Sequence, residues 1–392
     1  MKFLSICRIC EQFPPAKGGL AGGIHAMTQA QHEMGNEITV IAPYHPGSES
    51  FDCRQKFPII RVPAKRTFDF GIKAFNEYRK LRNQIDIVHT HGPSAILWAT
   101  LKRKTKPFLV HTVHSVRRYQ YLQYDRYLSV RNSTEQSVSN SYKCWNPYIA
   151  KELFLEQFVL KRVDHLCLVA DYFKEQLAIH YGIKPEKTTT VLNGSAFNFD
   201  VSIVDRDRNA LKGAVVLFVG RFDWHKRIDL LIRAHSLVIQ KKPHCQLILV
   251  GDGEQRSVIE ALIEKLRLQK NVMLTGWIEA SELNDYYQIA NCLCLPSIVE
   301  GLPKVLLEAM SVGVSIIASD NLAHTELLRN GKFGCLVNSA MPEKWAEAIL
   351  DTISEPPVVR LRIKASMNLL DNLYRWHHVA QRTQNAYEKL FA

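Results

Sequence analysis

Two glutamates eight positions apart could both contact a polar ligand. Glu300 precedes Gly301-Leu302-Pro303, and Glu308 follows among apolar residues. Pro303 is typical of the first position of a helix, which predicts Glu300 in a loop and Glu308 on the helix. Gly301 would let a ligand approach the backbone, whose amides after it point toward negative charge. A buried Glu308 needs partners, and we expect either ribose hydroxyls or a structural salt bridge.

Two cations follow an earlier apolar run. Arg221 and Lys226 come after a predicted strand at Val215 to Val219, and a helix is predicted to begin near Asp229. Side-chain charge adds to the positive end of a helix dipole, so the pair predicts an anion site of the size of a diphosphate. An ordinary surface position is the alternative for either cation.

A glycine-rich turn and two histidines stand out in the first half. The turn Ala16 to Gly23, with Gly19 at its centre, follows the first predicted strand and could let backbone amides approach a phosphate or a sugar. His111 lies within a predicted strand, and His114 follows it directly. A turn that changes the chain direction and a structural histidine are the alternative interpretations.

These residues depend on a series of apolar runs that alternate with amphipathic stretches of helical length. This alternation is typical of βα units and predicts an α/β fold with parallel sheets. Ligands of such sheets bind outside the carboxyl ends of the strands. The predicted strands are Phe3 to Ile9, Glu37 to Ala42, Asp86 to His91, Phe108 to Val113, His165 to Val169, Val215 to Val219, Gln246 to Val250, Val272 to Leu274, Leu293 to Pro296 and Ser315 to Ala318.

The length of 392 residues, 46% of them hydrophobic, is enough for two cores of ordinary domain size. A strand predicted to end at Val191-Leu192-Asn193-Gly194, followed by a mostly polar segment as far as Lys212, indicates the boundary. We therefore predict an N-terminal domain over residues 1–195 and a second domain over 196–365. A final helical segment, 366–392, follows a proline break and is expected to pack elsewhere.

The net charge of +12 is concentrated in the first half, where residues 1–199 hold 27 Lys and Arg against 16 Asp and Glu, a balance of +11. A basic face indicates a lipid headgroup, an acidic glycan or a nucleic acid as partner, or simply a solvated surface. We expect no nucleic acid, because the charge is diffuse and no recognised motif is present.

Apolar stretches, the first residues of the chain and the cysteines indicate the cellular compartment of the protein. No stretch approaches the roughly 20 apolar residues of a spanning helix, and the opening MKFLSICRI is interpreted as a strand rather than a signal peptide. The nine cysteines show no disulfide or zinc pattern, and the Cys7/Cys10 pair is expected to be inert. These features predict a cytoplasmic protein, with peripheral contact to a membrane as an option.

Taken together, the motifs resemble those of glycosyltransferase family 4, the retaining enzymes of the GT-B fold, over nearly the whole chain. The segment Glu300 to Met310 looks like the Glu-x7-Glu signature of that family. Phe218-Val219-Gly220-Arg221 with Lys226, and Leu249 to Gly253, are similar to its donor-domain strands. Trp376 and Tyr387 resemble its final helix, which crosses back to the N-terminal domain.

The resemblance implies two Rossmann-like domains facing across a cleft, with a nucleotide-sugar as donor. Arg221 and Lys226 would hold the diphosphate, Glu308 the ribose, and Glu300 the transferred sugar with the amides of Gly301 and Leu302. The remaining implied site residues are Pro303, Gly19 at the diphosphate, His114 near the sugar, and Gly276, Trp277 and Ile278 at the base. The leaving diphosphate would take the acceptor proton, so no cofactor and no metal ion is expected. Uridine diphosphate is the favoured donor half.

Acceptor choice is expected in the first domain, where Arg117 to Tyr127, continuing to Trp145, interleaves basic residues with tyrosines. This composition suits a membrane interface or a sugar-stacking surface, and a loop with a solvated helix is the alternative. A glycan, a lipid-linked sugar or a small molecule would then be the acceptor. Other enzymes of the same fold remain alternatives, namely a starch or glycogen synthase, a sugar epimerase or a phosphorylase.

Overall fold

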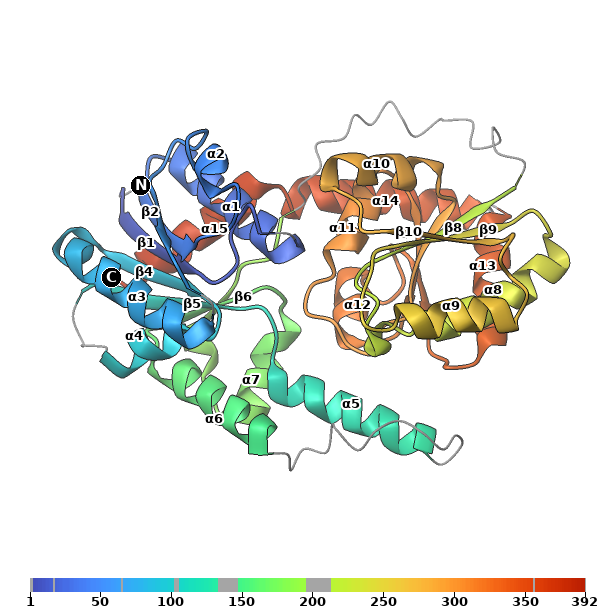
Figure 1. Ribbon diagram of the computed structural model, residues 1–392, viewed down its shortest axis with the longest axis horizontal. Coiled ribbons are helices and arrows are strands. Elements are labelled where there is room, and N and C mark those ends of the chain that lie inside the picture. Colours follow the sequence, from blue (N-terminus) through green and yellow to red (C-terminus); the bar gives the residue numbers. More distant parts are fainter. Residues whose placement is uncertain are drawn as a thin grey trace. The chain divides into compact units, whose positions relative to one another are not determined.

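The computed structural model describes residues 3–16, 18–64, 66–101, 106–132, 147–194, 213–354 and 357–391. The chain forms two compact units (Figure 1). Unit 1 comprises Met1–Ala196 together with Leu373–Ala392, and unit 2 comprises Phe197–Asn372.

Unit 1 is built on a parallel sheet with the strand order β3-β2-β1-β4-β5-β6-β7. The strands β1, β4 and β5 at its centre are buried along most of their length, and the buried residues of β4 include the polar His89, Thr90 and His91. Because all pairs are parallel, the strands end at one edge of the sheet. The strands are β1 (Ser5–Cys10), β2 (Glu37–Pro43), β3 (Ile59–Val62), β4 (Ile87–His91), β5 (Phe108–Val113), β6 (His165–Leu168) and β7 (Thr188–Thr190).

Helices cover this sheet, and the last helix of the chain is among them. The helix α15 lies against α1, and residues of both belong to one apolar core with the centre of the sheet (Figure 1). The C-terminal segment therefore belongs to the first unit. The helices of unit 1 are α1 (Gly19–Glu33), α2 (Ser48–Asp52), α3 (Thr67–Leu81), α4 (Ala95–Leu101), α5 (Arg117–Asn132), α6 (Pro147–Arg162), α7 (Tyr172–Tyr181) and α15 (Trp376–Glu388).

Unit 2 repeats the architecture with a second parallel sheet of order β10-β9-β8-β11-β12-β13. Its strands are β8 (Val215–Val219), β9 (Gln246–Val250), β10 (Val272–Gly276), β11 (Cys292–Leu295), β12 (Ser315–Ser319) and β13 (Cys335–Val337). Its helices are α8 (Ile228–Lys241), α9 (Arg256–Lys265), α10 (Ala280–Ile289), α11 (Lys304–Ser311), α12 (Leu322–Leu327), α13 (Pro342–Ile353) and α14 (Pro357–Leu373). The helices α8 and α13 pack on each other.

The predicted fold class, two α/β units with parallel sheets, is confirmed. Two short strands were not predicted, β3 and β13, which have four and three residues. The strand that was expected to end at Val191–Gly194 is β7, which already ends at Thr190. The expected start of a third segment at residue 366 falls inside α14, because that helix runs on to Leu373. The predicted polar linker lies largely in residues 195–212, outside the described part of the chain.

Candidate active site

The carboxyl ends of β8, β9 and β10 in unit 2 are joined by backbone hydrogen bonds. Gly220 donates to Val250 at 3.0 Å, and Gly251 donates to Gly276 at 2.9 Å. Gly251 has a φ of +134°, and a Cβ there would lie 2.0 Å from the carbonyl oxygen of Gly220. Only glycine at position 251 allows the ends of β8 and β9 to approach this closely. The predicted donor residues lie at this edge of the sheet.

Lys226 and Glu300 meet at this edge. Nζ of Lys226 lies 2.5 Å from Oε1 of Glu300, and the side chains are 17% and 12% exposed. Lys226 ends a short 3₁₀ turn after β8, and Glu300 lies in the loop after β11. The backbone amide of Ile298 donates to the carbonyl of His225 at 2.9 Å, which holds the two loops together.

The ion pair and burial together set the protonation of the groups around Glu300. Burial by itself raises the pKa of Glu300, but the charge of Lys226 lowers that pKa below its ordinary value. Burial, and then the Lys226 ammonium, lowers the pKa of His225 to about 4. Burial also lowers the pKa of His324 to about 4. At neutral pH the centre therefore holds an ionised carboxylate and two neutral imidazoles.

Glu308 lies on α11 and accepts a hydrogen bond from a buried tyrosine. The hydroxyl of Tyr287 is 2.7 Å from Oε2 of Glu308, and Tyr287 is fully buried. Burial raises the pKa of Glu308, while this hydrogen bond and the charge of Lys304 act in the opposite direction. Burial lowers the pKa of Lys304 to about 8. The carboxylate is thus held by a hydroxyl donor, with the Lys304 charge close by.

The first turn of α11 corrects one detail of the sequence analysis. Pro303 is the residue before the helix, with φ −73° and ψ 103°, and the first helical residue is Lys304. The proline side chain has no hydrogen-bond acceptor, so it cannot cap the backbone amides at the start of the helix. Pro303 instead contributes its fixed φ angle, which restricts the backbone before the helix. The predicted placement of Glu300 in the loop and Glu308 on the helix is correct. Gly301 and Leu302 lie between them in that loop.

Arg221 and the residues after β10 lie at the same edge of the sheet. The Arg221 side chain is 73% exposed, and its Nη2 is 2.8 Å from Oδ2 of Asp223. Gly276 ends β10 with a φ of +72°, and Ile278 follows two positions later. Trp277 between them is 49% exposed. An exposed indole of this kind is suited to stacking on a planar base.

The structure therefore gives both predicted cations an acidic partner within unit 2, Asp223 for Arg221 and Glu300 for Lys226. The sequence predicted Arg221 and Lys226 as two cations of one anion site and predicted a separate role for Glu300. The carboxyl-edge placement of Arg221, Lys226, Glu300 and Glu308 agrees with the loops named from the sequence. Their roles toward a ligand stay predictions.

Unit 1 places a histidine pair at the carboxyl edge of its own sheet. His114 follows β5, and its Nε2 lies 3.3 Å from Nδ1 of His91 at the end of β4. The ring of His91 stacks on His89 at 4.4 Å between centroids. Nδ1 of His89 is 2.5 Å from the hydroxyl of Tyr387 on α15, and its Nε2 is 2.6 Å from the hydroxyl of Thr112.

Burial, with a contribution from a buried cation, keeps His89 and His91 neutral. Burial, and next the charge of Arg8, lowers the pKa of His89 well below its ordinary value. Burial, His89 and Arg8 do the same to the pKa of His91. Arg8 itself lies in β1 with no exposed surface, and its Nη2 donates to Oε1 of Gln31. The hydrogen bond between His91 and His114 therefore joins a neutral His91 to the edge residue.

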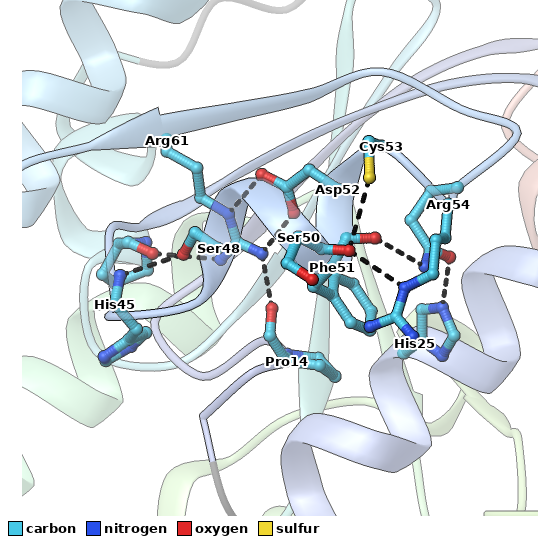
Figure 2. Close-up of polar contacts among 12 residues, drawn as sticks. Pro14, His25, His45, Ser48, Ser50, Phe51, Asp52, Cys53, Arg54 and Arg61 are labelled. Carbon is cyan, nitrogen blue, oxygen red and sulfur yellow. Dashed lines mark hydrogen bonds and ion pairs between the residues drawn. The ribbon is translucent and has the colours of Figure 1, made fainter.

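The predicted glycine-rich turn, Ala16 to Gly23, is helical from Gly19 onward, so the helix begins earlier than the sequence indicated. Gly19 is the first residue of α1, and Gly18 before it has a φ of +124°. No side chain caps this helix end. Arg61 of β3 holds the preceding loop, because its guanidinium donates to the carbonyl of Pro14 (Figure 2). The same guanidinium donates to the Pro43 carbonyl at 3.0 Å and pairs with Asp52 at 2.8 Å.

Sequence reasoning missed two further residues at this edge, Glu11 and His91. Glu11 follows β1 directly, and its Oε1 accepts the backbone amide of Ser94 at 2.5 Å. Burial raises the pKa of Glu11. Its position straight after a central strand was the signal that could have identified it, as was the position of His91 at the end of a predicted strand.

The segment predicted to choose the acceptor is partly tied inward. Residues Arg117–Asn132 form α5, while residues 133–146 lie outside the described part of the chain. Arg117 pairs with Glu152 at 2.8 Å, and the hydroxyl of Tyr121 donates to the same carboxylate at 2.8 Å. Tyr119 is buried. The exposed part of α5 is therefore smaller than its composition indicated, and it includes Arg118, Leu122 and Arg126.

Comparisons with known proteins match both units. A family model described as glycosyltransferase family 4 matches residues 17–195, and one described as glycosyl transferases group 1 matches residues 203–368. The phosphatidyl-myo-inositol mannosyltransferase of Mycobacterium tuberculosis is 30% identical over 400 residues, which covers 98% of this chain and 97% of that protein.

Solved structures share the fold over the whole chain. The sucrose-phosphate synthase of Thermosynechococcus elongatus superposes with a TM-score of 0.78 at 21% identity, covering 99% of each chain. HepE of Anabaena, in complex with UDP-glucose, superposes with a TM-score of 0.72 at 16% identity, covering 98% of this chain and 99% of that one.

Proposed function

We propose, starting from the fact that this chain is a glycosyltransferase and belongs to glycosyltransferase family 4, that it transfers a sugar from a nucleoside diphosphate-sugar with retention of configuration. The observation that carries this proposal is the contact between Lys226 and Glu300 at the carboxyl edge of unit 2, beside α11 with Glu308. A cation and two carboxylates at the carboxyl edge of a parallel sheet, where ligands of such sheets bind, support a sugar diphosphate as the ligand.

The proposed roles follow from charge. Arg221 and Lys226 bind the diphosphate and stabilise the charge that develops as it leaves. Glu308 accepts hydrogen bonds from the ribose, because Tyr287 occupies only part of its acceptor capacity. Glu300 binds the transferred sugar together with the amides of Gly301 and Leu302.

Five further residues complete the proposed site. Trp277, flanked by Gly276 and Ile278, stacks on the base. In unit 1, His114 contacts the sugar and the amide end of α1 at Gly19 approaches the diphosphate. The leaving diphosphate takes the acceptor proton, and we propose that the reaction needs no metal ion, so activity should survive addition of EDTA.

We propose uridine diphosphate as the donor half. HepE, which shares the fold, is described in complexes with UDP, glucose and UDP-glucose. Similarity to a phosphatidyl-myo-inositol mannosyltransferase supports a lipid or lipid-linked acceptor. A glycan or a small molecule is the alternative acceptor.

We further propose that the protein works in the cytoplasm and touches an anionic membrane at its periphery. The +11 balance of the first half and the exposed cations of α5 support this contact. None of the helices in the described ranges is long and apolar enough to cross a bilayer. Liposome flotation in low and high salt tests the proposal, which fails if the protein shows no salt-sensitive binding to anionic vesicles.

The decisive experiment for the donor is a thermal-shift panel of UDP, GDP, ADP and inorganic phosphate. Wild type should be stabilised by one nucleoside diphosphate, since a ligand of the native state raises its stability. Glu308→Ala should lose the shift, and Glu264→Ala, an exposed glutamate on α9, should keep it. No shift with any nucleotide at millimolar concentration would refute the proposed donor class.

A further inference from the structure

A cavity of about 200 Å³ lies in unit 1 at the amino ends of β4 and β5, the ends opposite to His91 and His114. It is enclosed by α3, α4 and the first residues of β4 and β5, with Val88 and Leu109 among its walls. Parallel strands end at the opposite edge, where His91 and His114 lie, so this cavity is separate from the proposed reaction site. In Figure 1 the helices α3 and α4 are neighbours beside these strands.

Three aromatic rings form the apolar part of the cavity. Phe75 and Trp98 meet edge to face with 5.5 Å between centroids, and Tyr78 and Trp98 with 6.1 Å. Trp98 is only 4% exposed, and its Nε1 has no hydrogen-bond partner in the described part of the chain. Buried donors are normally paired, so this N–H is one that a ligand oxygen would satisfy.

The rim of the cavity carries cations in excess. Arg79, Arg82 and Lys106 line it. The two acids of α3 are already used elsewhere, because Asp69 pairs with Lys73 at 3.0 Å and Glu77 pairs with Lys80 at 2.8 Å.

Arg79 and Arg82 at the rim, unlike Lys73 and Lys80, are not neutralised by an acidic side chain of the described residues. Neither Arg79 nor Arg82 forms an ion pair with any residue in the described ranges, and both side chains are exposed. Lys106 contacts Asp86 at 2.8 Å and lies 4.4 Å from the ring centroid of Phe391. The arginines therefore give the mouth of the cavity a positive charge that an anion could balance.

We propose that this cavity binds an anionic amphiphile, with an alkyl or aromatic body among the rings and a phosphate or carboxylate at Arg79 and Arg82. The volume suits one chain end or one ring, and it is below the roughly 300 Å³ at which ordinary drug-sized sites begin. The ligand could be a lipid in a membrane or a soluble acyl or aromatic anion. The site is independent of the residues assigned to sugar transfer.

The test measures binding of dodecyl phosphate, below its critical micelle concentration, by calorimetry. Wild type should bind it, whereas inorganic phosphate and the uncharged dodecyl maltoside should bind far more weakly. Arg79→Gln with Arg82→Gln should weaken binding about tenfold or more, because two exposed charge contacts are lost. The control, Lys73→Gln with Lys80→Gln, removes the same charge from α3 at positions that do not line the cavity.

Flotation with phosphatidylglycerol and phosphatidylcholine vesicles identifies the source of the ligand. Flotation on phosphatidylglycerol that depends on Arg79 and Arg82 identifies a membrane lipid, and binding of dodecyl phosphate without flotation identifies a soluble anion. The proposal is overturned if wild type does not bind dodecyl phosphate or if dodecyl maltoside binds as tightly as dodecyl phosphate. It is also overturned if the arginine double variant and the lysine double variant lose affinity for dodecyl phosphate equally. Circular dichroism melts confirm that both variants are folded.

Discussion

Nζ of Lys226 lies 2.5 Å from Oε1 of Glu300, although the two residues are 74 positions apart in the sequence. Both side chains are mostly buried, so removal of one partner leaves an uncompensated charge. The contact joins the loop after β8 to the loop after β11, and the charge of Lys226 lowers the pKa of Glu300. It therefore bears on both stability and the proposed transfer.

Replacing Lys226 with methionine should damage both properties. We expect kcat/KM to fall at least about 100-fold, because a cation is lost where negative charge develops. Stability should fall by about 3 to 5 kcal/mol, the usual cost of breaking a buried pair. Urea denaturation and a donor-hydrolysis or transfer assay measure the two effects.

A second substitution separates charge balance from catalysis. Lys226→Met combined with Glu300→Gln removes both charges, so much of the stability should return while activity stays low. Lys242→Met, at an exposed lysine after α8, should change neither. Full activity in Lys226→Met would contradict the role proposed for this cation.

Tyr287→Phe should weaken nucleotide binding in a pH-dependent way. The tyrosine hydroxyl lowers the pKa of Glu308, which burial has raised, so its loss raises that pKa further. A protonated Glu308 is a poorer acceptor for ribose hydroxyls. Calorimetry with UDP should show a larger loss of affinity at pH 5.5 than at pH 8, and an equal loss at both values would argue against this account.

The sequence predicted the carboxyl-edge residues of unit 2 because glycines, prolines and charged residues there follow strongly apolar runs. The pairing of Lys226 with Glu300 was not predictable from those runs, since it depends on how two distant loops approach. The same holds for His91 with His114 and for Tyr287 with Glu308. Spacing identifies the loop on which a residue lies, and packing decides its partner.

The missed elements have a similar physical cause. β3 is the tetrapeptide Ile59–Val62, and β13 is the tripeptide Cys335–Val337, so neither offers enough residues for a period to be recognised. Arg8 lies within the first predicted strand, and its charged side chain is fully buried, which the sequence pattern does not reveal. The arrangement of the two units, with the predicted cleft between them, stays a prediction.

Gly251→Ala should destabilise unit 2 strongly. The new Cβ would lie 2.0 Å from the Gly220 carbonyl oxygen, and the residue would have to keep a φ of +134°. We expect a loss of more than about 2 kcal/mol, the scale of strained backbone with overpacking. Gly22→Ala in α1, where nothing lies within 4 Å of the new Cβ, should be neutral or stabilising by up to about 1 kcal/mol. Equal effects of the two changes would contradict the close approach of the β8 and β9 loops.

Acid should destabilise the protein partly through His235 of α8, which has no exposed surface. Burial lowers the pKa of His235 to about 4 from an ordinary 6.5, so between these values the unfolded chain binds a proton that the folded chain does not. Stability must then fall as the pH falls from about 6.5 to about 4, by up to about 1.4 kcal/mol per pH unit for this one residue. His235→Leu should reduce the slope of unfolding free energy against pH by about one proton, measured by urea denaturation at pH 7.5, 6 and 5.

Val238→Leu, at a buried position on the same helix, changes packing without removing a proton site and should leave that slope as it is. An unchanged slope in His235→Leu would mean that this imidazole is protonated equally in both states.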